Sequence, residues 1–169
     1  PVISGGKIYV TGIPDTLAGM GRLFVFDLKG KVLWTKDYGS EFTALYPGAR
    51  STPSVAGDHL YIESGIGSVY CLNAHTGEQI WNVDFFSDLG ADSVQFGFSE
   101  SLLIEDDRLY CTPGGKSHNM VALNRFTGEI LWASPGSGEQ ATYSSPVLFR
   151  HRGRPLLVNL TASHILGLE

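Results

Sequence analysis

The sequence lacks the features that mark several common functional classes. Its 12 Lys and Arg against 17 Asp and Glu give a net charge of −5, so the clustered basic surface of a nucleic-acid-binding protein is not expected. No apolar run approaches the roughly 20 residues of a membrane-spanning helix. The five histidines show no metal-ligand spacing such as His-x3-His, so no metal site is expected. The two cysteines, Cys71 and Cys111, lie in unlike contexts and are predicted to be free and buried.

Glycine and a recurring phrase are what the chain has in abundance. It contains 21 glycines, and the phrase TGEQIW at 76–81 returns as TGEILW at 127–132 and, more loosely, as KGKVLW at 29–34. Similar apolar segments precede each copy, such as GGKIYV at 5–10 and DDRLYC at 106–111. This self-similarity indicates three complete structural repeats and most of a fourth.

Each repeat has the periodicity of four short strands. In the second repeat the apolar segments are 53–56, 59–64, 68–72 and 78–83, and none has the spacing of a helix. Four-stranded units of about 40–50 residues, repeated, are typical of a β-propeller. The sequence therefore predicts an all-β partial β-propeller over residues 1–169, with about three and a half blades of four antiparallel strands each. The predicted blades are 1–39, 52–85, 101–136 and 144–169, the last one incomplete.

The repeated phrase has a structural explanation. Its Gly supplies the positive φ that turns the chain into the outermost strand of a blade, and its Trp follows on that strand at the seam with the next blade. One blade cannot bury its own faces, so each repeat needs this Trp again. All three Trp side chains are therefore predicted at equivalent, largely buried places. The motif residues are Gly30, Trp34, Gly77, Trp81, Gly128 and Trp132.

These phrases resemble the PQQ-like propeller repeat of the quinoprotein alcohol dehydrogenase-like superfamily, whose blades end in T-G-x-x-x-W. The resemblance runs through 72–81 and 123–132, more loosely through 26–34, and covers essentially the whole chain. Wider phrases, such as those at 46–55 and 97–116, resemble bacterial PQQ-binding-like and polyvinyl-alcohol dehydrogenase-like propellers. The same repeat builds BamB-like assembly lipoproteins, which are scaffolds without a quinone. The resemblance implies a ring of about eight blades, of which this chain holds nearly half, and a periplasmic or otherwise extracytoplasmic location.

Connections of unequal length indicate where a binding site would lie. Those at 36–50, 84–99 and 134–143 are long and share one face of the propeller, whereas the tight turns share the other. Function concentrates on loops that a rigid scaffold holds. Aligning the repeats places five residues of the candidate site at the mouth of the central channel on this long-loop face: Arg50, Ser51, Glu100, Tyr143 and Ser144.

Charged residues on this face suggest two kinds of role. Arg50 could grip a carboxylate or a quinone oxygen bidentately, and Glu100 could pair with it or ligate a cation. The alternative is an Arg–Glu pair with the neighbouring hydroxyls bound to loop backbone. Lys116 and His118 lie on the Gly-rich loop 113–119 of the same face, but no helix follows, so a phosphate-cradling loop is not favoured.

Two functions from different classes remain open. One is a non-catalytic scaffold or binding module that takes a protein partner or a small ligand on the long-loop face. The other is a quinoprotein alcohol or polyvinyl-alcohol dehydrogenase that uses PQQ with calcium. For the enzyme, the resemblance implies a vicinal Cys–Cys disulfide, a Trp beneath the quinone, and Glu, Asn and Asp residues as ligands and base. This chain has no adjacent cysteines, and its three Trp residues belong to the seam motif, so a scaffold without a cofactor is expected.

The open faces at the two ends of the partial ring are expected to recruit a partner. The fourth repeat has no fourth strand, so the strand edge at 165–168 is predicted to be unpaired. Exposed edges and apolar faces favour association. If 1–169 is the whole polypeptide, two copies are expected to form a homodimer through the first and fourth blades.

Overall fold

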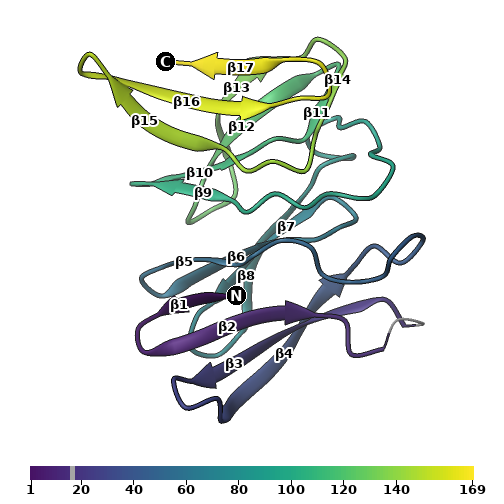
Figure 1. The fold of residues 1–169 in the computed structure, drawn as a ribbon, viewed down its shortest axis with the longest axis vertical. Coiled ribbons are helices and arrows are strands. Elements are labelled where there is room, and N and C mark those ends of the chain that lie inside the picture. Colours follow the sequence, from purple (N-terminus) through teal and green to yellow (C-terminus); the bar gives the residue numbers. More distant parts are fainter. Residues whose placement is uncertain (16–17) are drawn as a thin grey trace.

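Four antiparallel β-sheets follow one another along the chain in the computed structural model, which describes residues 1–15 and 18–169 (Figure 1). Each sheet is one blade, and its strands pair in chain order. Blade one consists of β1 (Val2–Ser4), β2 (Lys7–Gly12), β3 (Met20–Asp27) and β4 (Val32–Ser40). Blade two consists of β5 (Ser54–Ala56), β6 (His59–Glu63), β7 (Ser68–Asn73) and β8 (Gln79–Asp84).

The later blades repeat this order with one addition and one omission. Blade three consists of β9 (Leu103–Glu105), β10 (Arg108–Cys111), β12 (His118–Asn124) and β13 (Ile130–Pro135). Blade four has only three strands, β15 (Val147–His151), β16 (Arg154–Leu160) and β17 (Ile165–Leu168). The addition is a separate two-stranded sheet that joins β11 (Gly114–Gly115) to β14 (Glu139–Gln140).

The all-β architecture of four-stranded antiparallel blades is confirmed. In blade two, each strand begins and ends within one residue of the bounds that the repeat predicts. Cys71 and Cys111 are free and buried, as predicted. None of the described residues belongs to a helix that could cross a membrane.

Each seam between neighbouring blades has its own apolar core. Tyr9 and Leu23 of blade one pack with Leu60 of blade two, and Trp81 of blade two packs in a larger core with Leu109 of blade three. The core between blades three and four is the smallest of the three. Its buried members are Tyr110, Met120, Ala122 and Leu157.

The Trp of one blade contacts the Gly of the next blade at two seams. A Cβ added to Gly77 would lie 2.9 Å from Cζ3 of Trp34, and one added to Gly128 would lie 2.9 Å from Cε3 of Trp81. Both glycines have positive φ, at 73° and 79°. The Gly of the repeated phrase therefore has two functions: it turns the chain, and it leaves room for the Trp of the preceding blade. We call the seam between blades two and three the filled seam.

Trp132 does not follow this pattern, so the prediction of three largely buried Trp side chains is wrong at this position. Its side chain is 40% exposed, whereas Trp81 is 9% exposed. Among the described residues, no glycine takes the place beside the Trp132 ring that Gly128 takes beside the Trp81 ring. We call the seam between blades three and four the open seam.

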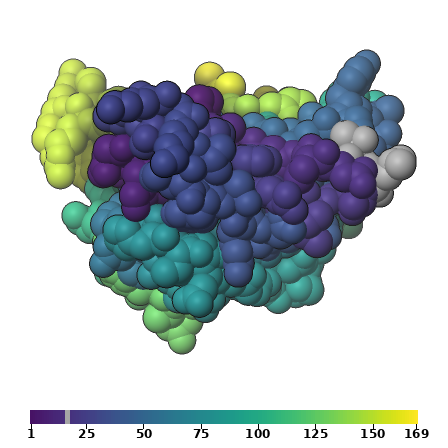
Figure 2. All heavy atoms as spheres, turned by 90° about the horizontal axis from the view of Figure 1, so that it is seen from below, coloured from purple at the N-terminus to yellow at the C-terminus, as the bar shows by residue number. Residues whose placement is uncertain are grey.

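The two ends of the blades differ in the length of their connections. In Figure 1 the short turns, such as the β15–β16 hairpin, lie on the left, and the long connections that follow β4, β8 and β13 lie on the right. Figure 2 shows blade one from outside, with the steel-blue connection after β4 projecting at one side and the hairpin near residue 150 at the other. Positions 16 and 17, between β2 and β3, lie outside the described residues.

Candidate functional site

Buried polar side chains at the long-loop ends of the inner strands hydrogen-bond from one blade to the next. Thr11 donates from Oγ1 to the carbonyl oxygen of Ser51 at 3.0 Å. Ser51 donates in turn from Oγ to the carbonyl of Glu63. The backbone N–H of Glu100 then donates to Oε1 of Glu63 at 2.8 Å. The first three blades are joined in this way.

The same line of contacts continues into blade four with neutral side chains. Nδ2 of Asn159 donates to Oγ1 of Thr112 at 2.7 Å. Oγ of Ser144 donates to Oδ1 of Asn159 at 2.9 Å. Thr112 also hydrogen-bonds Glu100, so the contacts run without a break from blade one to blade four. We call this set the polar belt: Thr11, Ser51, Glu63, Glu100, Thr112, Asn159 and Ser144.

Two carboxyl groups lie side by side in the middle of the polar belt. Glu63 and Glu100 are both almost fully buried. Burial, and then the charge of Glu100, raises the pKa of Glu63, and burial raises the pKa of Glu100 to about 8. Oε2 of Glu63 and Oε1 of Glu100 have no hydrogen-bond partner among the described residues. Burial therefore favours the protonated form of both carboxyl groups.

A third buried carboxyl, that of Glu41, lies near the pair. It accepts hydrogen bonds from the Tyr38 hydroxyl and, at 2.6 Å, from the backbone N–H of Gly65. Burial raises the pKa of Glu41, although both of these hydrogen bonds oppose the shift. Three buried carboxyl groups thus gather at the channel end of the long-loop face, and burial raises the pKa of each.

Arg50 does not reach the carboxyl pair. One of its terminal nitrogens donates to the carbonyls of Leu45 and Tyr46, at 2.7 and 2.8 Å, and its guanidinium lies over the Phe42 ring, 5.1 Å from the centroid. No ion pair joins it to Glu100 in the described part of the chain. Arg50 therefore supports its own loop, and the predicted Arg–Glu pair is not formed.

The structure brings together only some of the residues predicted for the site. Ser51, Glu100 and Ser144 belong to the polar belt. Tyr143 is 53% exposed, on the loop surface. Lys116 is exposed, and His118 is the first residue of β12, so neither lies in the belt.

The Gly-rich loop 113–119 brings three connections together. Gly114 and Gly115 have positive φ, and a Cβ on either would come within 2.8 Å of the backbone of the neighbouring loops. Their partners are Ala141 on one side and Gly90 on the other. The glycines are thus explained by close backbone packing at the small β11–β14 sheet and against the loop at Gly90.

Each long connection exposes an aromatic side chain on the long-loop face. Tyr46 is 79% exposed, Phe86 is 44% exposed, and Tyr143 stands beside Phe96 with ring centroids 6.2 Å apart. The connection after β8 is fixed to the turn between β6 and β7, since Phe98 donates its N–H to the carbonyl of Gly65 at 2.9 Å. We call Tyr46, Phe86 and Tyr143, together with the exposed Leu45, the aromatic rim.

Sequence reasoning missed the belt residues that come from second strands. Glu63 and Thr112 occupy the same position of the repeat, at or just beyond the end of the second strand of their blades. A carboxylate that closes an apolar strand, as in LYIE, was the available signal for Glu63. The sequence contains no comparable signal for Asn159, because its hydrogen bond to Thr112 depends on how blade four contacts blade three.

The described residues do not fit the quinone site that the resemblance implies. Trp34, Trp81 and Trp132 all lie on the fourth, outermost strand of their blades, away from the channel end. No group of three or more His, Cys, Asp or Glu among the described residues could hold a metal ion. The two orphaned carboxyl oxygens of Glu63 and Glu100 lack a third ligand of these types among the described residues.

The sequence matches a protein-family model over most of its length. Residues 19–169 match the family described as outer membrane protein assembly factor BamB. The chain is also 25% identical over 138 residues to that assembly factor from Kangiella koreensis, covering 79% of this chain and 32% of the relative. It is 27% identical over 146 residues to a quinoprotein ethanol dehydrogenase from Pseudomonas aeruginosa, covering 79% of this chain and 22% of the relative.

Similarity to solved structures supports the fold. The crystal structure of BamB from Moraxella catarrhalis aligns with a TM-score of 0.61 at 16% identity, over 89% of this chain and 42% of that chain. The chain thus spans about a third of one curated relative that it matches and about a fifth of the other.

Proposed function

The chain belongs to the outer membrane protein assembly factor BamB family, and from this premise we propose that it is a non-catalytic, extracytoplasmic β-propeller scaffold that binds a protein partner on its long-loop face. The proposal concerns the part of the protein that these residues form, since the relatives are longer. Such a module has no small-molecule substrate, because its role is to hold another protein in place.

The aromatic rim is the observation that carries the proposal. Three successive long connections each present one aromatic side chain to solvent on the same face. Tyr and Phe are enriched at protein–protein interfaces, because they bury a large area and lose little conformational entropy. The blades beneath hold these loops by inter-blade hydrogen bonds, such as that from Glu100 to Glu63, so the rim is presented on a rigid base.

The chemistry of the polar belt also favours binding over catalysis. Most belt side chains hydrogen-bond to backbone groups or to each other, and these bonds join the blades. The two carboxyl groups with free oxygens are almost fully buried, out of reach of a substrate on the loop surface. A partner would therefore contact the rim and leave the belt intact.

Site-specific photo-crosslinking tests the proposal. A benzophenone amino acid placed at Tyr46, Phe86 or Tyr143 should form a covalent adduct with a partner in the cells that produce the protein. Phe126 is the matched control, because it is also 44% exposed but lies in the tight turn on the opposite face. The captured partner is then purified, and its affinity for the chain is compared with that of a Tyr46→Ser, Phe86→Ser, Tyr143→Ser variant.

The expected result is an adduct from rim positions only and a loss of about tenfold or more in affinity for the triple variant. Equal crosslinking from Phe126, or unchanged affinity of the variant, would contradict a partner site at the rim. Cell fractionation supplies a second check: an extracytoplasmic protein is released with the periplasmic or membrane fraction.

A quinoprotein dehydrogenase is the second candidate, and the relative from Pseudomonas aeruginosa favours it. Adding PQQ and Ca²⁺ to the protein and measuring dye reduction with alcohols distinguishes the two functions. The scaffold predicts no reduction that depends on both additions. Alcohol oxidation that requires both would replace the scaffold by the enzyme.

A further inference from the structure

The connection after β4 holds an aromatic residue in a backbone conformation that side chains rarely adopt. Tyr46 has a φ of 51°, in the left-handed region, where a side chain crowds the backbone. Two other described residues that are not glycine share such a φ, Asp106 and Arg152, and both lie in the tight β9–β10 and β15–β16 turns. Hairpin turns of this kind require positive φ. Tyr46 lies in an irregular segment instead, where no strand pairing requires its conformation.

The other two long connections have glycine wherever their chain path takes a positive φ. Gly90 and Gly97, after β8, have φ of 66° and 75°, and Gly138, after β13, has φ of 77°. Glycine adopts such angles at no steric cost, because it has no Cβ. A Gly at position 46 would therefore give the same chain path without strain. The reason for Tyr at this position lies in what its side chain does.

The Tyr46 side chain adds nothing to the internal packing of the loop. It is 79% exposed, the largest exposed fraction of any large apolar or aromatic side chain in the described part of the chain. It has no hydrogen bond and no ring contact among the described residues. Its neighbours Leu45 and Pro47 are exposed as well, and Figure 2 shows this connection projecting from the molecule. We call Leu45, Tyr46 and Pro47 the tip.

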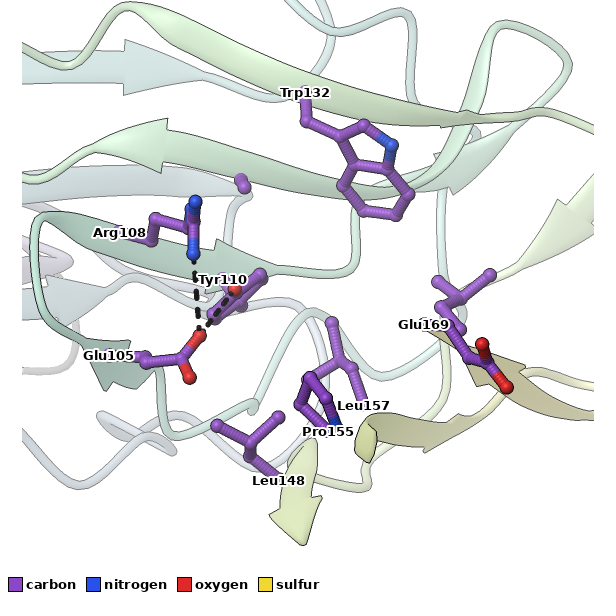
Figure 3. Close-up of a pocket in the computed structure, with 10 residues that line it drawn as sticks. Glu105, Arg108, Tyr110, Trp132, Leu148, Pro155, Leu157 and Glu169 are labelled. Carbon is purple, nitrogen blue, oxygen red and sulfur yellow. Dashed lines mark hydrogen bonds and ion pairs between the residues drawn. The ribbon is translucent and has the colours of Figure 1, made fainter. Parts of the chain in front are cut away.

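Trp132 shows that exposure alone does not make an aromatic side chain project. It is 40% exposed, but it lines a cavity of about 350 Å³ together with Tyr110 and Leu157 (Figure 3). Its φ is not positive. The Trp132 ring thus borders a hollow within the molecule itself, whereas the Tyr46 ring stands outside the surface on a strained backbone.

Arg50 holds the tip from below. Its Nη2 donates to the carbonyl oxygens of Leu45 and Tyr46, at 2.7 and 2.8 Å. These carbonyls belong to the two peptide groups that flank the Cα of Tyr46, so one charged nitrogen fixes the backbone on both sides of that residue. Hydrogen bonds from a charged donor are among the stronger ones in proteins. The left-handed conformation of Tyr46 is therefore maintained by a specific contact.

Phe42 connects this support to the rigid part of the molecule. The Arg50 guanidinium lies over the Phe42 ring, 5.1 Å from its centroid. A Cβ added to Gly65 would lie 2.8 Å from Cβ of Phe42, and one added to Gly97 would lie 2.9 Å from its Cγ. Gly65 also donates its N–H to Glu41 at 2.6 Å. The tip is thus built on the β6–β7 turn and on the connection after β8, and it is presented in a fixed orientation.

We propose that Tyr46 is the anchor of partner binding, a side chain that inserts into an apolar pocket on the partner protein, and that Arg50 is the residue that positions it. The inference rests on the proposed function and goes beyond it, because it assigns most of the binding to one residue of the aromatic rim and describes the complementary surface. A convex apolar tip buries its area only in a concave site, and the phenol hydroxyl needs a polar group there. An anchor that is already fixed loses little conformational freedom on binding.

Single substitutions in the rim test the anchor. The probe is the protein that a benzophenone residue at Phe86 captures, because this capture does not involve position 46. It is produced in recombinant form and titrated with each variant. Tyr46→Ala should weaken its binding about thirtyfold or more, and Phe86→Ala and Tyr143→Ala about threefold each. Equal losses at the three positions would overturn the assignment of the anchor.

The same experiment separates the anchor from the proposed function. If no rim position captures a partner, the proposed function is rejected and the anchor with it. If Phe86 captures a partner whose affinity Tyr46→Ala leaves unchanged, the anchor alone is rejected.

A double-mutant cycle tests the positioning role of Arg50. Arg50→Met removes the donors and keeps an apolar side chain of similar length over Phe42. It should weaken binding of the probe about tenfold when Tyr46 is present and cause no further loss in the Tyr46→Ala protein, because Arg50 acts through Tyr46. An equal loss in both backgrounds would show that Arg50 contacts the partner directly, and it would overturn the positioning role.

Thermal midpoints test the strain without a partner. Tyr46→Gly should unfold about 2 °C or more above Tyr46→Ala, because only Gly adopts the left-handed conformation freely. Ala44 is the matched control, since it is exposed in the same connection and has no positive φ. Ala44→Gly should lower the midpoint by about 1–2 °C, through the greater freedom of the unfolded chain. A midpoint of Tyr46→Gly at or below that of Tyr46→Ala would contradict strain at this position and overturn the proposal.

Discussion

The filled seam and the open seam are built from equivalent residues, yet only one of them buries its Trp. Trp81 and Trp132 hold the same position of the repeat and differ in exposure, at 9% and 40%. Gly128 of the following repeat lies against the Trp81 ring, whereas no glycine of the described residues lies against the Trp132 ring. The burial of a seam residue is therefore decided by residues about 50 positions later in the chain.

The inner ends of the two seams differ as well. The filled seam places the carboxyls of Glu63 and Glu100 together, whereas the open seam joins Thr112 to Asn159, two neutral side chains. The inner end of one seam thus holds two titratable carboxyl groups, and the inner end of the other holds neutral side chains. Each difference between the seams leads to a measurement.

Removing the two Trp side chains should give the largest contrast. Trp81→Ala is expected to lower the free energy of unfolding by about 3–5 kcal/mol, because it empties a packed site and removes a hydrogen bond to the Arg125 carbonyl. Trp132→Ala should cost about 1 kcal/mol or less, since much of that ring is already in water. Urea unfolding measures both, and equal losses would contradict the difference between the seams.

A methyl group added to the turn glycines should separate backbone strain from crowding. Gly128→Ala places a Cβ 2.9 Å from the Trp81 ring at a φ of 79°, and we expect a loss of about 2–4 kcal/mol in unfolding free energy. Gly30→Ala has the same backbone strain at 83° but no atom within 4 Å, so about 1–2 kcal/mol is expected. If Gly30→Ala costs as much as Gly128→Ala, the Trp contact contributes nothing to the need for Gly.

The carboxyl pair should make the filled seam sensitive to pH. The pKa of Glu100 is raised to about 8 in the folded state, whereas an unfolded Glu titrates near about 4.3. Between these values the folded state binds more protons at Glu100, so the contribution of this group to the free energy of unfolding is largest at the acid end and falls as the pH rises toward 8. The expected slope is about 1 kcal/mol per pH unit.

Glu100→Gln should flatten this slope, because the amide has no proton to lose and its oxygen can still accept from Thr112. Urea unfolding of both proteins at a series of pH values from 5 to 8.5 is the measurement. A variant with the slope of the parent protein would show that another group titrates.

Two Tyr→Phe exchanges should give the smallest contrast. Tyr61→Phe removes a hydrogen bond that crosses the filled seam, and we expect a loss of about 1 kcal/mol in unfolding free energy. Tyr110→Phe removes one within a blade, to the partly exposed Glu105, and about 0.5 kcal/mol is expected. A larger loss for Tyr110 would mean that its hydroxyl already bridges the open seam.

The blades themselves were predictable from the sequence because the same pattern of strand segments and turns recurs in each repeat. Short apolar segments with tight turns between them recur in each repeat. The Gly and Trp of TGEQIW and TGEILW indicate where the outermost strand of a blade begins. Local alternation and turn chemistry decide where such strands begin and end. The bounds of β5 to β8 followed from these signals alone.

The polar belt and the exposure of Trp132 were not predictable in the same way. Belt contacts such as that between Asn159 and Thr112 join residues 47 positions apart, and they depend on how one blade lies against the next. Arg50 was considered for the site because its length and charge fit a ligand, and nothing in the sequence indicated that one of its terminal nitrogens donates to the carbonyls of Leu45 and Tyr46. Side-chain direction within a long loop leaves no periodic signal.

The division of each seam between two repeats bears on how such a chain changes in evolution. Gly77 and Gly128 are 51 positions apart, and Trp34 and Trp81 are 47 positions apart. The Trp and the Gly turn that meet at a seam therefore both recur with the repeat. Duplication or deletion of one whole repeat in the gene would leave every internal Trp with a Gly turn to contact, wherever within the repeat the break falls. Blade number can therefore change by unequal recombination without a new interface, while the long connections diverge separately.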